Sequence, residues 1–181
     1  PRWKQLRDEA LKSLDRGFKY DTKTGDAHLL HARLLGLPGG DKKKALEAVN
    51  KAIKLFDENK RKKSDSLIVR ADFRSDSEKQ LEDLNEALKV DPDNSSAWQI
   101  RAGYFFTKGE TKKGIADLQQ LLDRDPKNIR ALGQLAQAHL TLQQRDKALV
   151  HLDKIVELQP NSPDAYLMRS RFHQANNDLK K

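Results

Sequence analysis

The sequence predicts an all-α fold: an α-α superhelix, a solenoid of about ten helices paired as antiparallel hairpins. Two observations lead to this prediction. The same residue classes return every 34 residues in the second half of the chain, which is typical of stacked repeats rather than one globular core. Within each segment the apolar residues recur three or four positions apart, which places them on one face of a helix. We identify no convincing strand.

The 34-residue period is visible in several series of positions that stay in register with one another. These series are Pro92, Pro126 and Pro160; Leu84, Leu118 and Leu152; Trp98, Leu132 and Tyr166; and Ala102, Ala136 and Ser170. Because the series share one spacing, they define residues 95–128 and 129–162 as two regular repeats. Each unit is expected to be one helical hairpin that ends at its proline, since a helix seldom continues through the residue before proline.

The individual helices are expected where apolar stripes lie between turn-forming residues. The expected ranges are 3–18, 27–37, 42–56, 64–73, 78–90, 95–107, 111–124, 129–141, 145–158 and about 163–176. Asp26 and Asp41 are the expected N-caps of the second and third helices. The basic run 60–63 is expected to be part of a solvated connection between repeats, although it could also serve as a nuclear-import signal or a phosphate contact.

Composition narrows the classes of function. The 181 residues are 36% hydrophobic and 34% charged, as expected for thin apolar stripes on exposed helices. There is no cysteine, which excludes a disulfide framework and thiolate chemistry. No run approaches the roughly 18 apolar residues that a membrane span needs. The net charge of +8 is interleaved with acidic residues, so we interpret it as solvated helix surface rather than a nucleic-acid face.

At this point the residues resemble a known family. The tetratricopeptide repeat is a 34-residue helix–turn–helix unit with the pattern W-x2-L-G-x2-Y, then A-x3-F, then P. Residues 95–128 are similar to it through Trp98, Ala102, Phe105, Leu118 and Pro126, with departures at Arg101 and Gly114. Residues 129–162 are similar through Leu132, Leu135, Ala136, Ala148, Leu152 and Pro160, with a departure at His139. The chain is therefore identified as a member of this family, as a fragment of a longer protein.

The resemblance extends over a single array, residues 1–181. We expect the second helix of a truncated repeat at 1–24, repeats at 25–60, 61–94, 95–128 and 129–162, and a truncated or capping first helix at 163–181. Both ends fall inside repeats, which predicts a piece of a longer array; the alternative is that the end helices are caps. The repeat at 61–94 fits the family pattern less well. Its Ala71 and Leu84 are 13 residues apart, whereas Ala102 and Leu118 of the next repeat are 16 apart. Three residues are thus expected to be missing near Arg74.

The resemblance implies a protein-interaction scaffold whose first helices line a concave groove for a peptide or a partner's helix. The groove positions of the family, carried over to this chain, give the candidate binding residues Asp65, Asp72, Gln99, Gly103, Phe106, Arg130, Gln137 and Arg171. A glycine such as Gly103 would let a ligand backbone approach closely. The competing interpretation is that these residues are only solvated helix surface.

One variant of the family clamps the C-terminal carboxylate of chaperones with lysine, asparagine and arginine side chains. In one alignment, the matching positions here are Ile68, Asp72, Ile100, Arg130 and Gln134. If the alignment is shifted by one repeat, they are Gln99, Gly103, Gln134, Asp164 and Met168. Neither frame keeps the clamp, so the sequence argues against a chaperone-tail partner.

We identify no catalytic residue, cofactor site or metal site. His28 and His31 lie one helical turn apart, but no third ligand accompanies them, and a packing pair is the simpler interpretation. Gly39 and Gly40 break a helix and do not form a phosphate-binding loop. The alternatives to a peptide-binding scaffold are an RNA-associated helical-repeat protein and a regulatory arm of a larger enzyme. Exposed half-repeats at the ends could also self-associate.

Overall fold

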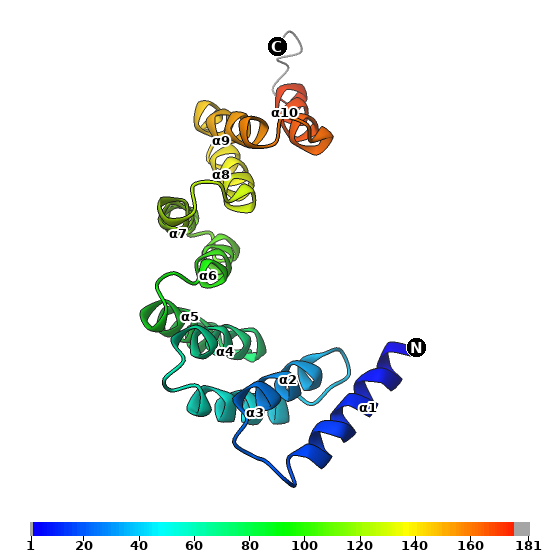
Figure 1. The fold of residues 1–181 in the computed structure, drawn as a ribbon. Coiled ribbons are helices and arrows are strands. Elements are labelled where there is room, and N and C mark those ends of the chain that lie inside the picture. Colours follow the sequence, from blue (N-terminus) through cyan, green and yellow to red (C-terminus); the bar gives the residue numbers. More distant parts are fainter. Residues whose placement is uncertain (1, 176–181) are drawn as a thin grey trace. The chain divides into compact units, whose positions relative to one another are not determined.

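The computed structural model describes residues 2–175 and contains ten α-helices in that part of the chain (Figure 1). Their bounds are α1 Arg2–Gly17, α2 Gly25–Gly36, α3 Lys42–Leu55, α4 Lys60–Phe73, α5 Ser77–Val90, α6 Ser95–Thr107, α7 Thr111–Arg124, α8 Ile129–Thr141, α9 Arg145–Leu158 and α10 Pro163–Ala175. No strand occurs among these described residues. The predicted all-α fold of helical hairpins is confirmed. No helix in the described range has the length and apolar character that crossing a membrane requires.

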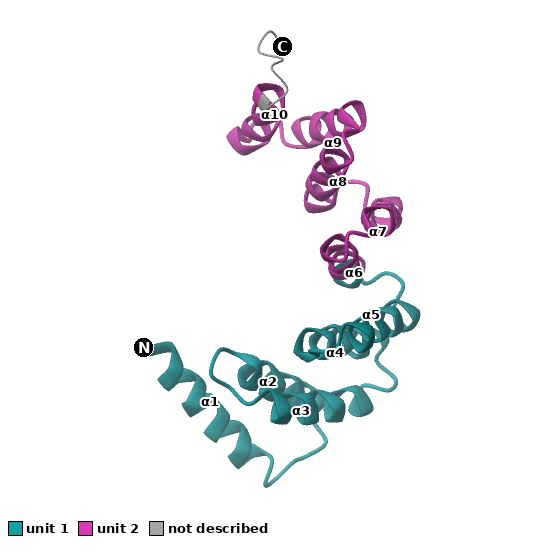
Figure 2. Ribbon diagram, turned by 180° about the vertical axis from the view of Figure 1, so that it is seen from behind, with its two compact units in different colours: residues 1–97 teal, residues 98–181 magenta. Residues whose placement is uncertain are grey.

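The chain separates into two compact units, residues 1–97 and 98–181, which Figure 2 colours differently. In the first unit α2 pairs with α3 and α4 pairs with α5, while α1 packs against α2. In the second unit α6, α7 and α8 share one apolar cluster, and α8, α9 and α10 share another. Each helix thus packs mainly on its neighbours in sequence, as expected for a repeat architecture.

Small residues let the helices of a hairpin approach closely. In the first unit Ala32 of α2 and Ala45 of α3 are fully buried and share one cluster with Val49. In the second unit the expected alanine is replaced by Gly114, and the structure shows the reason. The ring of Phe106 lies where the side chain of residue 114 would stand. Gly114 is therefore a local adaptation to a larger side chain on α6.

Polar side chains fix several helix starts. Asp41 accepts hydrogen bonds from the backbone N–H groups of Lys43 and Lys44, as predicted for an N-cap. The prediction for Asp26 was wrong. Residue Thr24 is the N-cap of α2 and makes no side-chain cap bond, whereas Asp26 lies in the first turn. There its carboxylate still faces the positive end of the helix dipole.

The basic run 60–63 is not a connection, contrary to expectation. It forms the first turn of α4, which is capped by the Asn59 side chain through the backbone N–H of Lys62 at 3.0 Å. Lys62 also pairs with Asp26 at 2.6 Å. The start of α4 is therefore set by a cap and by a charge partner 36 residues earlier in the sequence.

This earlier helix start also removes the expected three-residue deletion. The connections 74–76 and 108–110 each span three residues, and the helices on either side are 13 or 14 residues long. Counting back from Pro92 and Pro126, Ala71 corresponds to Phe105 and not to Ala102. Residues 61–94 thus have the full 34-residue length, and the apparent gap came from aligning the wrong alanine.

Candidate functional site

The second unit contains two neighbouring hollows. The larger has a volume of about 430 Å³ and lies along α8, α9 and α10; its lining residues are Gly133, Ala136, Gln137, Leu140, Leu152, Met168, Arg171 and Phe172. The smaller has a volume of about 220 Å³ and lies along α6, α7 and α8; its lining residues are Phe106, Thr111, Gln134, Gln137, Ala138 and Thr141. Because both hollows include Gln137, we treat them together as the groove of the second unit.

The repeat places equivalent residues of successive first helices in this groove. Gln137 of α8 and Arg171 of α10 are 34 residues apart, so they hold the same position in their repeats, and both line the larger hollow. Gly133 lies one turn before Gln137 on the same side of α8. Two of the eight candidate binding residues, Gln137 and Arg171, therefore meet at one place, next to Gly133.

The chemistry of the groove is mixed. Arg171 is exposed and forms no ion pair with the residues that the structure describes, so its five N–H donors face solvent. The Oε1 atom of Gln134 is buried in the smaller hollow and has no hydrogen-bond donor among the described residues. Leu140 and Met168 supply apolar surface. The groove thus offers a cation, a buried acceptor and an apolar contact.

The structure separates the eight predicted site residues into groups. Phe106, Gln137 and Arg171 line the groove. Gly103 on α6 has open space beside its Cα, and Arg130 is exposed in the first turn of α8, but neither lines either of these two hollows. Asp72 is an exposed residue of α4 in the first unit.

Asp65 and Gln99 have other partners. Asp65 accepts a hydrogen bond from the Nδ2 atom of Asn94 at 2.8 Å, and Gln99 donates to the Oδ1 atom of Asn128 at 3.2 Å. Both asparagines in turn accept hydrogen bonds from backbone N–H groups at the start of the next first helix. These two side chains connect successive repeats.

Sequence reasoning did not select Gln134, Met168 or Phe172 for the groove, although all three line it. Gln134 and Met168 entered only as positions at which the chaperone clamp fails. Phe172 is buried and belongs to the apolar cluster of α8, α9 and α10. A core residue that also borders a hollow carries no separate sequence signal.

The two histidines of the first unit have packing roles. His28 stacks on Phe18, with ring centroids 4.4 Å apart, and its Nε2 atom lies 3.0 Å from the carbonyl oxygen of Thr22. His31 lies 5.4 Å from the same phenyl ring and 3.5 Å from Asp15. No cluster of three metal-binding side chains occurs in the described part of the chain. The geometry supports the packing interpretation of this pair.

Comparisons with known proteins agree with the fold. The MamA crystal structure is 18% identical and has a TM-score of 0.70 over 88% of this chain and 92% of its own. The YrrB structure, described as a tetratricopeptide repeat protein with an unusual peptide-binding site, is 18% identical with a TM-score of 0.65 over 92% and 84%. The first such domain of Spaghetti, bound to an HSP90 peptide, is 18% identical with a TM-score of 0.55 over 65% and 95%.

At the sequence level no curated protein matches the chain. Two family profiles do match, both described as tetratricopeptide repeat. They cover residues 80–129 and 105–181 and overlap at the regular repeats that first revealed the period. Together with the helical hairpins and the solved neighbours, these matches show that the chain belongs to the tetratricopeptide repeat family.

Proposed function

We propose that this chain is a protein-interaction scaffold and that its second unit binds a peptide segment of a partner protein. The observation that carries the proposal is the groove itself. Gln137 and Arg171, which hold one repeat position on α8 and α10, line one hollow with Gly133 and with apolar side chains. Tetratricopeptide repeat proteins are in general non-enzymatic scaffolds, and we assign no reaction to this chain.

The groove suits an extended peptide. The exposed amide of Gln137, which lines both hollows, would hydrogen-bond the ligand backbone. Gly133 has no side chain, so the ligand backbone can approach α8 there. Arg171 would bind a carboxylate, and Leu140 with Met168 would contact an apolar side chain. The fold similarity to YrrB and to the Spaghetti domain supports this proposal, since both are described with peptide sites.

Selection from a phage-displayed random peptide library on the chain, followed by fluorescence anisotropy of the selected peptides, tests the proposal. Arg171→Glu removes one well-formed charged contact and should weaken binding about tenfold or more. Gly133→Gln fills the groove with a side chain and should weaken binding by at least a similar factor. Lys147→Glu, at an exposed residue of α9, is the matched control and should change the affinity little. Selected peptides that bind the two groove variants as tightly as the parent would contradict the proposed site.

A further inference from the structure

In three hairpins the same position of the second helix holds a polar side chain that contacts the first helix of the hairpin. Asp117 of α7 accepts two hydrogen bonds from Arg101 of α6, both at 2.8 Å. Asp83 lies 34 residues earlier and is bonded to an arginine of α4 at 3.0 Å. His151 lies 34 residues later and stacks on His139, with ring centroids 5.4 Å apart. In each of these hairpins the position holds a polar side chain with a partner.

The hairpin α2–α3 has an alanine at this position. The buried residues of α3 and α7 have the same spacing, which makes Ala48 the counterpart of Asp117. On the first helix, His31 immediately precedes the buried Ala32, just as Arg101 precedes Ala102. The place that holds an arginine–aspartate pair in one hairpin therefore holds a histidine and an alanine in the other. The hairpin position itself has no carboxylate, and His31 instead lies 3.5 Å from Asp15 of α1.

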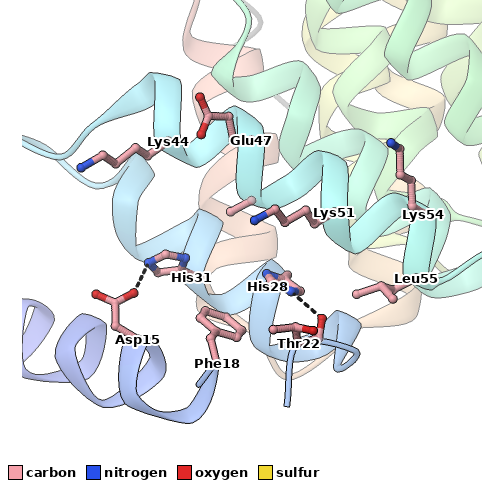
Figure 3. Close-up of a pocket in the computed structure, with 11 residues that line it drawn as sticks. Asp15, Phe18, Thr22, His28, His31, Lys44, Glu47, Lys51, Lys54 and Leu55 are labelled. Atoms are coloured by element: carbon pink, nitrogen blue, oxygen red, sulfur yellow. Dashed lines mark hydrogen bonds and ion pairs between the residues drawn. The ribbon is translucent and has the colours of Figure 1, made fainter. Parts of the chain in front are cut away.

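A hollow of about 650 Å³ lies at this place (Figure 3). Its lining residues are Asp15, Phe18, Thr22, His28, His31, Lys44, Glu47, Ala48, Lys51, Lys54 and Leu55. Figure 3 shows Asp15 entering from α1, Phe18 from the turn that follows α1, the two histidines from α2 and the lysines from α3. A volume of this size lies within the range of about 300–1,000 Å³ that ligand pockets have.

The charges around the hollow favour an anion. Lys51 and Lys54 are exposed, and neither forms an ion pair with any described residue. Burial lowers the pKa of His31; the nearby Asp15 opposes this shift, and the positive charges of Lys51 and Lys44 add to it. Two lysine charges and the Asp15 carboxylate therefore all act on His31.

We propose that this hollow binds an acidic segment of a partner protein. An aspartate or glutamate of that segment enters beside Ala48, where its carboxylate takes the role that Asp117 has inside its own hairpin. Lys51 and Lys54 donate hydrogen bonds to it and provide the opposite charge. An apolar neighbour in the segment contacts Phe18 and Leu55. This site lies within the first unit, and the inference does not depend on the groove of the second.

The lining also favours a protein over a nucleic acid. Asp15 and Glu47 face the same hollow as the lysines and would repel a continuous phosphate backbone. A peptide can place its single carboxylate near the lysines and its uncharged groups near these two acids. The apolar surface of Phe18, Ala48 and Leu55 suits an aliphatic side chain. The expected ligand is therefore a short segment in which an acidic residue adjoins an apolar one.

The test uses the full chain and three labelled probes in fluorescence anisotropy at low ionic strength. The first probe is a short neutral peptide into which one glutamate next to a leucine is placed, the second has glutamine in place of that glutamate, and the third is an oligouridine RNA. We expect the glutamate peptide to bind at least tenfold more tightly than either other probe. Equal binding of the glutamine peptide, preferential binding of the RNA, or no binding of the glutamate peptide would each overturn the proposal.

Variants locate the binding. Ala48→Asp restores the missing carboxylate inside the hollow and should weaken binding of the glutamate peptide at least tenfold. Because a new buried charge can also unfold the hairpin, the exposed pair Lys51→Glu and Lys54→Glu provides an independent test with the same expected loss. Lys43→Glu, an exposed lysine of α3 that does not line the hollow, should stay within twofold of the parent. Loss in the Lys43 variant equal to that in the Lys51 and Lys54 variants would refute the site.

Discussion

Replacing Leu118 with alanine should destabilise the second unit by a predictable amount. Leu118 is fully buried in the cluster that α6, α7 and α8 share, next to Ala102 and Leu135. The substitution removes roughly three buried carbon groups, and each is worth about 0.8 kcal/mol of transfer free energy. The cavity that remains adds to this cost, so the expected loss is about 2–5 kcal/mol of unfolding free energy.

The effect is measured by urea unfolding and by thermal melting of the parent and the variant. For a chain of this size each kcal/mol corresponds to about 2–4 °C in Tm, so a shift of about 4–20 °C is expected. Leu167→Ala is the matched control, because Leu167 is 46% exposed in the same unit and should shift Tm little. A Tm for the Leu118 variant equal to that of the control would show that Leu118 is not core, and the repeat register would be wrong.

Two further predictions concern acid stability and the chaperone clamp. Burial, followed by the charge of His139, lowers the pKa of His151 from its ordinary value of 6.5. The unfolded chain therefore takes up a proton at higher pH than the folded chain, so stability is full above about pH 6.5 and is lost as pH falls through the folded pKa. Tm should fall between about pH 7.5 and about pH 5, and less so in His151→Gln; an equal fall in that variant would exclude His151 as the cause. Separately, a peptide ending in an HSP90-type acidic tail should bind no better in calorimetry than the same peptide with an amidated C-terminus, and a marked preference for the free carboxylate would contradict this prediction.

The period predicted what depends on spacing alone. Leu84, Leu118 and Leu152 are spaced 34 residues apart, and all three are buried. Spacing fixes which face of a helix a residue occupies, and in a repeat protein that face is buried against the neighbouring helix. The same logic explains why Gln137 and Arg171 meet in one hollow. These features needed no knowledge of side-chain partners.

The start of α4 could not be predicted in this way. Residues 60–63 are all basic and show no apolar stripe, so periodicity gives no helix signal there. What holds them in a helix is the Asn59 cap, the ion pair of Lys62 with Asp26 and that of Lys63 with Asp57 at 2.6 Å. Asp26 is distant in sequence, and only the packing of α4 near α2 brings it within reach. Tertiary contacts therefore determine the start of α4, which the local sequence pattern does not predict.

The position that Asp65 and Gln99 share shows why the groove opens where it does. Each of these side chains forms a hydrogen bond with the asparagine that directly precedes the first helix of the next repeat, Asn94 or Asn128. One period later the position holds Gly133, which has no side chain. The residue that follows Asn128 by 34 positions is a serine, which has no amide group to receive such a bridge. The bridge that connects the earlier repeats is thus missing at α8, and the larger hollow lies at Gly133. A change of two residues in the repeat thus replaces a structural contact with open space, and this is the space in which we propose that the peptide binds.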